Sequence, residues 1–289
     1  PYNAKFWTVP AQQLTCEWFD GFIPIPSLSQ VVEGTVKENK KAYGYNAKFW
    51  YPERGGIEKL ADAFARQIQN ICTGCPVTEV NFKRKEVKTL KGRTEKFDYL
   101  VSTVALPELP GIIKDMPAEI IENCRRLRWN SIFNLNLGID RDNAQDKHWI
   151  YFPEKDTSFF RVGFFHNFSE NLSPAGKGSL YIEVSYSENK PIDKKGILLR
   201  IKRDLEKLNI LRAADKIYAS DINDIKYGYP IYDSSYSACR KEILDYLLQN
   251  KVFSCGRYGS WRYMTMEEAL LDGKRAAQNS AHLLKYETH

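Results

Sequence analysis

The chain has 289 residues, which suits one large or two medium domains and is long enough to bury a substantial core. Hydrophobic residues make up 43% and charged residues 27%, so the composition is that of a globular protein. The net charge of +6 is modest, and basic residues are interleaved with acidic ones. This pattern argues against a nucleic-acid partner and favours an anionic small-molecule substrate or cofactor.

The cysteines and the apolar segments indicate the cellular compartment and the absence of a metal site. Six cysteines are scattered through the chain without a secretory segment, which predicts reduced thiols and a cytoplasmic protein. Cys72 and Cys75 have the spacing of a redox or zinc pair, but no second pair of ligands follows, so we expect no metal. No apolar run approaches the roughly 20 residues of a membrane span. The chain opens at Pro1, which is typical of a cut end.

The first fifty residues are aromatic, and their prolines predict an irregular segment. The string Tyr-Asn-Ala-Lys-Phe-Trp occurs at Tyr2–Trp7 and at Tyr45–Trp50, but the flanks differ, so we expect two similar segments and not a repeat array. Next, the apolar spacing predicts a helix over Ile57–Ile68, with Gly55-Gly56 as the hinge at its start. Three strands are then expected, at Val77–Lys83, Glu86–Leu90 and Phe97–Thr103.

The second part of the chain alternates helical and strand patterns. Hairpin-length connections between the strands predict an antiparallel sheet. Helices are expected at Pro117–Leu127, Gly196–Leu208, Ala238–Leu248 and from about Met266 to Leu284. Strands or extended stretches are expected at Ser131–Ile139, Trp149–Phe152, Phe159–Phe165, Ser179–Ser187, Lys216–Tyr229 and Val252–Cys255.

The sharpest motif follows the last of these strands. Gly256-Arg257-Tyr258-Gly259 stands between a buried strand and a long helix. Helix N-termini carry unpaired N–H groups and a partial positive charge, and glycines let a ligand approach the backbone closely. The Arg257 guanidinium suits a pyrophosphate. From these residues alone, an ordinary loop with a capping glycine is an equally good interpretation.

The wider pattern, Gly-Arg-x-Gly-x-x-x-Tyr-x-x-Met at residues 256–266, resembles the last flavin-contacting motif of the FAD-dependent amine-oxidase superfamily. That superfamily includes protoporphyrinogen oxidases and UDP-galactopyranose mutases. Three more segments resemble it in the same order: Tyr51-Pro52-x-x-Gly55-Gly56 as its helix entry, Pro76–Val80 as its adenine-contacting strand, and Asp98–Thr103 with Pro107 as a strand end.

The resemblance implies a fold of the α/β (α+β) class. A partial FAD-binding domain would comprise residues 51–105 and 251–289, and a substrate domain, with an antiparallel sheet and flanking helices, would comprise residues 1–50 and 106–250. The family's Gly-x-Gly-x-x-Gly unit does not occur in this sequence, so we expect the C-terminal portion of a two-domain enzyme. The residues implied for FAD are Val77 at the adenine and Gly256, Arg257, Tyr263, Thr265 and Met266 at the flavin.

Two further segments resemble the mutase branch. Tyr2-x-x-Lys5-x-Trp7 matches the opening of its substrate region, and Tyr229-Pro230-Ile231 matches a segment whose tyrosine lines its sugar-nucleotide site. The resemblance implies that Lys5, Trp7, Tyr229 and Tyr263 line one cleft between the two domains, with Lys5 meeting an anion. Thr265 departs from the mutases, which usually have Asp there.

Three functions stay open at this point. The first is hydride transfer from a small-molecule substrate to flavin, as in amine oxidases and protoporphyrinogen oxidases. The second is a mutase-like isomerisation of a sugar nucleotide, and the third is a non-catalytic binding remnant. Arg161 is expected on a strand, where it points either to a substrate anion or to solvent. No triad or carboxylate pair identifies a catalytic residue. An apolar face left by the missing unit would favour homo-oligomers.

Overall fold

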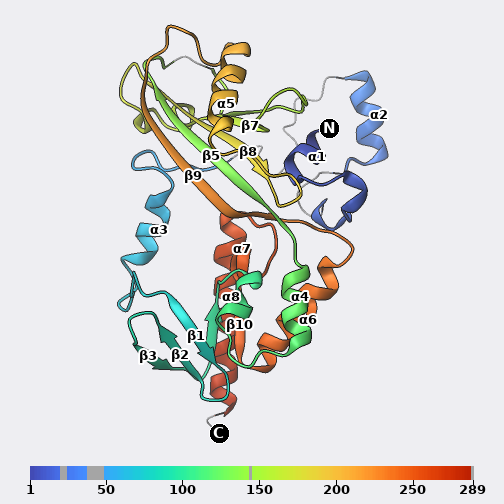
Figure 1. Cartoon of the computed structure of the whole chain (residues 1–289), viewed down its shortest axis with the longest axis vertical. Helices are drawn as coiled ribbons and strands as arrows, with labels where there is room; N and C mark the ends of the chain where they lie inside the picture. Colours follow the sequence, from blue (N-terminus) through green and yellow to red (C-terminus); the bar gives the residue numbers. More distant parts are fainter. Residues whose placement is uncertain (20–24, 38–48, 143–144, 288–289) are drawn as a thin grey trace.

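A computed structural model describes residues 1–19, 25–37, 49–142 and 145–287, with side chains through Leu284. Most of the second Tyr-Asn-Ala-Lys-Phe-Trp string, residues 45–48, lies outside the described residues. The molecule is elongated, with a large antiparallel sheet at one end and smaller sheets and helices at the other (Figure 1). This mixture of helices with mainly antiparallel sheets confirms the expected fold class.

The large sheet has five antiparallel strands in the order β6-β7-β8-β5-β9. Alternate side chains of β5, β7 and β8 point into one buried cluster, which the amphipathic helix α5 covers. This period-two burial explains why the strands were predictable from the sequence. The bounds are β5 Trp129–Ile139, β6 Trp149–Tyr151, β7 Arg161–Phe164, β8 Gly178–Tyr186, β9 Ile217–Pro230 and α5 Gly196–Lys207.

In the part of the chain that the structure describes, the other end, which we call the lower part, contains two small sheets and five α-helices. Strands β4 and β10 form a two-stranded parallel sheet, although they are far apart in sequence, and β1, β2 and β3 form an antiparallel meander. The strands are β1 Val77–Asn81, β2 Glu86–Thr89, β3 Thr94–Lys96, β4 Leu100–Ser102 and β10 Val252–Ser254. The helices are α3 Glu58–Ala65, α4 Ala118–Arg126, α6 Tyr236–Gln249, α7 Gly256–Gly259 and α8 Met266–Glu287.

The beginning of the chain is more regular than expected, and the prediction of an irregular segment was wrong. It contains the helices α1 (Tyr2–Trp7) and α2 (Leu28–Val36), and short 3-10 turns η1 (Ala11–Gln13) and η2 (Glu17–Phe19). A capping box begins α2, because the Ser27 and Gln30 side chains each accept a hydrogen bond from the other's backbone N–H. That Ser-x-x-Gln pattern was readable in the sequence.

One buried cluster crosses the expected domain boundaries. It joins Val80 of β1 and Val252 of β10 to Leu106 in the 3-10 turn η3 (Leu106–Gly111), and it also includes Ile243 of α6. The third strand is shorter than expected, since β4 covers only Leu100–Ser102. The division into a cofactor domain and a substrate domain stays a prediction. Among the described residues, no helix is long and apolar enough to cross a membrane.

Helix α3 stands at the side of the molecule, as Figure 1 shows. Its amphipathic pattern was predictable, but its apolar side chains are not buried: Leu60 is 38% exposed, Phe64 50% and Ile68, just beyond the helix, 56%. Leu270 and Leu271 of α8 are also exposed. The lower part therefore carries apolar surface that the large sheet lacks on its α5-covered face.

Candidate functional site

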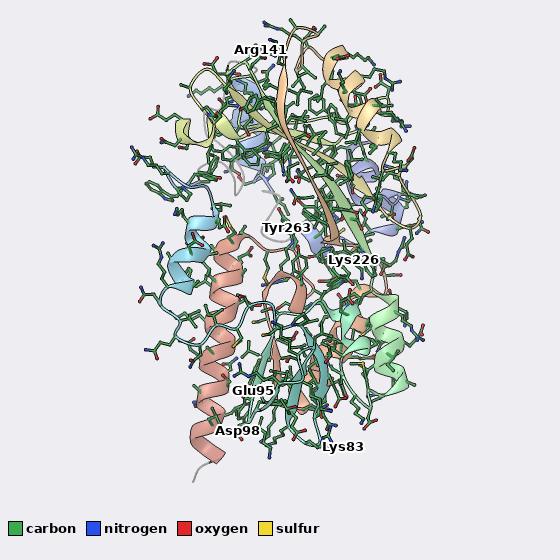
Figure 2. All side chains as sticks on the ribbon, turned by 60° about the vertical axis from the view of Figure 1, so that its left-hand side comes forward. Lys83, Glu95, Asp98, Arg141, Lys226 and Tyr263 are labelled. Atoms are coloured by element: carbon green, nitrogen blue, oxygen red, sulfur yellow. The ribbon has the colours of Figure 1, made fainter. Side chains whose placement is uncertain are left out.

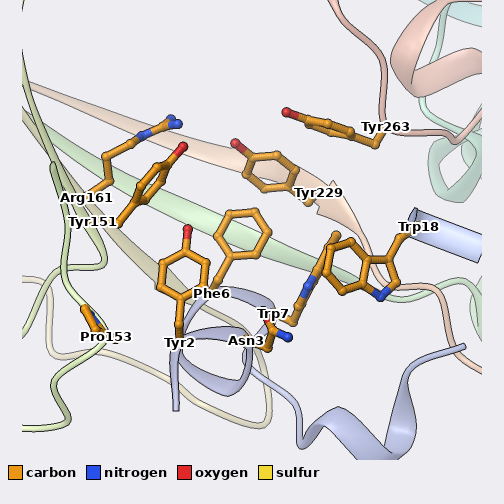
Figure 3. Close-up of a pocket in the computed structure, with 10 residues that line it drawn as sticks. All are labelled: Tyr2, Asn3, Phe6, Trp7, Trp18, Tyr151, Pro153, Arg161, Tyr229 and Tyr263. Atoms are coloured by element: carbon orange, nitrogen blue, oxygen red, sulfur yellow. The ribbon is translucent and has the colours of Figure 1, made fainter. Parts of the chain in front are cut away.

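An aromatic pocket of about 560 Å³ lies where α1 meets the large sheet (Figure 3). Its walls come from α1, η2, β6, β7, β9 and the segment before α8. The residues that line this aromatic pocket are Tyr2, Asn3, Phe6, Trp7, Trp18, Tyr151, Pro153, Arg161, Tyr229 and Tyr263. Tyr263 lies between the two ends of the molecule in Figure 2 and lines the pocket from the side of the lower part.

Helix α1 supplies one wall through the helical period. Tyr2 and Phe6 are four residues apart, as are Asn3 and Trp7, so these side chains share one side of the helix. The Phe6 carbonyl, in the last turn, accepts hydrogen bonds from Asn130 Nδ2 (2.6 Å) and from Ser185 Oγ. These bonds satisfy a carbonyl that a helix C-terminus leaves open, and they fix α1 to β5 and β8.

Tyr229 occupies the middle of the pocket. Its ring centroid lies 4.6 Å from that of Phe6, 6.1 Å from that of Trp7 and 5.4 Å from that of Tyr263. Burial raises the pKa of the Tyr229 hydroxyl, so this phenol stays neutral. Burial also raises the pKa of the Tyr2 hydroxyl. The pocket therefore offers neutral aromatic faces that suit a planar or sugar group.

Arg161 is the cation of the aromatic pocket. It stands on β7 opposite Glu183 of β8, and its Nε donates to the Glu183 carboxylate. Burial alone would lower the pKa of Arg161, but Glu183 outweighs burial and holds the pKa well above its usual value. The guanidinium carbon also lies 5.9 Å from the Tyr151 ring centroid. A permanent positive charge therefore borders the aromatic walls, as Figure 3 shows.

Arg257 supports the pocket from behind. Its guanidinium carbon lies 4.5 Å from the Tyr229 ring centroid and 5.0 Å from that of Tyr263, which are cation–π distances. One terminal nitrogen donates to the Gly228 carbonyl at 2.8 Å. The Nε atom is buried and has no hydrogen-bond partner among the described residues. A buried N–H without a protein partner can donate a hydrogen bond to an acceptor atom of a bound ligand.

Three of the four expected substrate residues meet in this pocket, namely Trp7, Tyr229 and Tyr263. Lys5 does not, and the expectation that it shares their cleft was wrong. Positions two apart on a helix point about 200° apart, so Lys5 and Trp7 cannot face the same cavity. The Lys5 ammonium instead donates to the carbonyls of Phe152 (3.0 Å) and Glu154 (2.8 Å).

On the expected flavin side, two backbone amides already have partners. The Gly256 N–H donates to Asp272 Oδ2 at 2.8 Å, and the Thr265 N–H donates to Glu268 Oε2 at 2.7 Å. Carboxylates of α8 therefore already accept hydrogen bonds from these two amides, and the assignment of Gly256 and Thr265 to the flavin stays a prediction. Thr265 and Glu268 form a capping box, which the Thr-x-x-Glu spacing signals.

The remaining expected cofactor residues are accessible. Met266, the first residue of α8, is 56% exposed, and the amides of Met266 and Glu267 have no partner within the described part of the chain. Val77 begins β1 and is 39% exposed, and it does not line the aromatic pocket. No group of His, Cys, Asp and Glu side chains suited to a metal occurs among the residues that the structure describes.

Sequence reasoning did not select several residues of the pocket. Tyr2 stood in the quoted Tyr-x-x-Lys-x-Trp pattern, and its spacing to Phe6 would have pointed to it had a helix been expected. Trp18 and Tyr151 carried no such signal, because η2 and β6 approach α1 only in the folded chain. Arg161 was considered, and the structure places it in the pocket.

Comparison of the sequence with models of known families identifies the family of this chain. The family model "Flavin containing amine oxidoreductase" matches residues 18–279, which is most of the chain. This chain belongs to the flavin-containing amine oxidoreductase family. The resemblance found in the sequence is thereby confirmed.

Solved structures share the fold of this amine oxidoreductase chain. Reduced UDP-galactopyranose mutase has a TM-score of 0.89 at 23% identity, covering 100% of this chain and 63% of the mutase. An Exiguobacterium sp. 255-15 protein with the provisional name protoporphyrinogen oxidase has a TM-score of 0.64 at 13% identity, covering 78% and 51%. A Pyrococcus furiosus protein has a TM-score of 0.56 at 14% identity, covering 79% and 53%. The chain thus spans less than two thirds of each of these proteins.

Proposed function

We propose that this chain is part of an FAD-dependent enzyme that holds a sugar nucleotide in the aromatic pocket and isomerises its sugar. The observation that carries the proposal is the meeting of Trp7, Tyr229 and Tyr263 with Arg161 around one cavity. Aromatic faces suit the sugar and the base, and a guanidinium suits a diphosphate. The pocket has no carboxylate or histidine among its described lining residues.

FAD fits the residues at the rear of this pocket. The buried Arg257 Nε and the first-turn amides of α8 are donors that would hold the flavin end, and Val77 would meet the adenine. The bound flavin would supply the electrons for the chemistry. This chain would bind the substrate, orient it and exclude water, with Arg161 holding the anionic group and the rings shaping the sugar site.

A second candidate is hydride transfer from a small-molecule substrate to FAD, as in amine oxidases and protoporphyrinogen oxidases. Thr265, where the mutases usually have Asp, favours it, and so does the strand end from Val101 to Pro107. The aromatic pocket would then hold an apolar or planar substrate, with Arg161 binding a carboxylate. The two candidates differ in whether a nucleotide diphosphate binds.

Substrate binding can be tested on this chain without flavin. Titration with UDP-galactose should quench the fluorescence of Trp7 and Trp18, which both line the pocket. The variant Arg161→Gln should bind about tenfold or more weakly, because a charge-assisted hydrogen bond is worth about 1.5–3 kcal/mol. Arg125→Gln, which removes the same charge from the exposed surface, is the matched control. Equal affinity in both variants would contradict the sugar-nucleotide proposal.

Flavin retention tests the cofactor proposal. The chain lacks the Gly-x-Gly-x-x-Gly unit that holds a pyrophosphate in this family, so we expect it to lose FAD on desalting. A form of the protein that carries such a unit should stay yellow, and its Arg257→Met variant should retain less flavin. Stoichiometric flavin absorbance in the present chain after desalting would show that the residues described above suffice.

For the reaction itself, the yellow form should be reduced and incubated with UDP-galactopyranose under anaerobic conditions. Chromatography measures the conversion. Formation of the ring-contracted sugar nucleotide would support the isomerase function. Oxygen consumption with an amine or porphyrinogen substrate, and no conversion of the sugar nucleotide, would support the second candidate.

A further inference from the structure

A second cavity, of about 340 Å³, lies on the other side of α1 from the aromatic pocket. Side chains from α1, the connection between β6 and β7, β8 and α5 surround it. The residues that line this basic pocket are Pro1, Ala4, Lys5, Pro153, Lys155, Thr157, Ser158, Phe160, Val184, Ser185, Lys190, Pro191, Ile192, Ile197 and Arg200. Pro153 borders both cavities, but the other walls differ.

Among the described residues, four cationic side chains and no carboxylate line this cavity. Lys155, Lys190 and Arg200 form no ion pair among the described residues, while the Lys5 ammonium contacts two carbonyls. Positive charges gathered around a concave surface raise its affinity for anions. Burial lowers the pKa of Lys5 to about 8; Glu154 opposes this decrease and Lys190 adds to it.

Glu154 is the carboxylate that acts most strongly on Lys5, and three other nearby carboxylates have partners outside the cavity. Asp156 forms an ion pair with Lys207, and Asp204 accepts from the Ser158 N–H at 2.8 Å. Asp193 accepts from the Lys195 N–H just before α5. Their negative charge partly offsets the cations, but none of them lines the cavity. The cavity surface is therefore cationic.

The floor of the cavity suits a small polar group. Phe160, Val184 and Ile197 are buried beneath it and give a firm apolar base. Thr157 and Ser158 also line the cavity, and Ser158 Oγ is buried with no hydrogen-bond partner among the described residues. Ammonium and guanidinium groups around such hydroxyls are the partners that phosphate oxygens require.

We propose that the basic pocket is a second anion site, which takes the phosphate or diphosphate group of a small molecule. Lys190 and Arg200 provide positive charges that attract the anion, and Lys5 and Lys155 are the other two cations that line the cavity. This site is separate from the aromatic pocket, because α1 stands between them. The proposal does not depend on the proposed function, since it uses none of Arg161, Tyr229 or Tyr263.

Isothermal titration with inorganic pyrophosphate at low salt tests the site. The parent chain should bind one pyrophosphate, and the double variant Lys190→Gln/Arg200→Gln should bind about a hundredfold more weakly, roughly tenfold for each lost charge-assisted contact. Lys195→Gln/Lys202→Gln is the matched control, because it removes the same charge from the start and the outer face of α5 without touching the cavity. The control variant should bind pyrophosphate with the same affinity as the parent chain.

Equal loss in the two double variants would overturn the proposal, since the binding would then reflect net charge alone. A loss in Arg161→Gln with none in Lys190→Gln/Arg200→Gln would also overturn it, because pyrophosphate would then occupy the aromatic pocket. Repeating the titration with UDP identifies the source of the phosphate. If the Lys190→Gln/Arg200→Gln variant also loses UDP binding, the site accepts nucleotides, and if not, it accepts free phosphates alone.

Discussion

The large sheet and the lower part differ in how completely they are covered. In the large sheet, β5 pairs on both sides, and α5 closes one face over fully buried side chains such as Phe164 and Ile182. In the lower part, β4 and β10 form a parallel sheet of only two strands, and α3 leaves Phe64 half exposed. Parallel sheets in proteins are normally covered on both faces.

This difference separates two sources of stability. The core of the large sheet comes from described residues between 133 and 211, whereas Ile222 and Ile225 of its edge strand β9 are exposed. The lower part buries its cluster on the α4 and α6 side but keeps apolar groups of α3 and α8 in water. Substitutions of the same chemical kind should therefore have unequal effects in the two regions.

The largest effect is expected from Phe164→Ala in the large sheet. Phe164 is fully buried in the cluster beneath α5, and truncating a buried phenylalanine costs about 3–5 kcal/mol of unfolding free energy. Urea unfolding followed by circular dichroism measures the change. A loss under about 1 kcal/mol would mean that this core is loosely packed, and the contrast with the lower part would fail.

A smaller loss is expected from Arg161→Gln. This change leaves the Glu183 carboxylate without its cross-strand cation in a site where the glutamate side chain is only 12% exposed. Breaking a buried pair costs about 3–5 kcal/mol, and the partial exposure of Arg161 reduces this to about 2–3 kcal/mol. The double variant Arg161→Gln/Glu183→Gln should recover part of the loss, and a further loss would exclude the stranded charge as its cause.

Lys5→Met should cost about 1–2 kcal/mol, because two hydrogen bonds to carbonyls of the 152–154 segment disappear. Burial lowers the pKa of Lys5 to about 8 in the folded chain, below its unfolded value. Between these two values the unfolded chain binds more protons, so the parent gains stability as pH rises. The gap between parent and variant should therefore widen above pH 8 in thermal melts, and a gap independent of pH would contradict the burial of this ammonium.

The smallest effect is expected from Phe64→Ala in α3, within about 0.5 kcal/mol, because the ring is already half exposed. It removes the same side chain as Phe164→Ala, so the two variants form a direct comparison between regions. A loss approaching that of Phe164→Ala in the same urea experiment would show that α3 packs in solution against a partner that the described chain does not supply.

The sequence predicted the parts of the fold in which burial imposes a period. The strands β5 and β8 and the helices α5 and α6 appeared near their expected positions, because buried positions recur along each of them with the period of the element. Strand β9 also appeared near its expected position, although its first ten residues are exposed. Helix α1 could not be predicted in this way. Its six residues include three aromatic rings, and its position depends on contacts with Asn130 and Ser185, far along the chain.

Only those residues of the aromatic pocket that belong to a sequence motif could be predicted. Trp7, Tyr229 and Tyr263 came from a family resemblance, and the structure places them together. Lys5 came from the same resemblance but lies outside this pocket, because the helix directs its side chain away from that of Trp7. The capping of Gly256 by Asp272 joins positions 16 residues apart, and no local pattern announces it.

The two hydrogen bonds to the Phe6 carbonyl have a consequence for binding strength. They hold the short helix α1 against two strands of the large sheet, so the rings of Tyr2, Phe6 and Trp7 keep their places before a ligand arrives. Ordering a mobile side chain on binding costs about 0.5–1.5 kcal/mol, and a wall that is already ordered avoids this cost. The aromatic pocket is thus pre-organised, and most of the contact energy it offers a ligand appears as affinity.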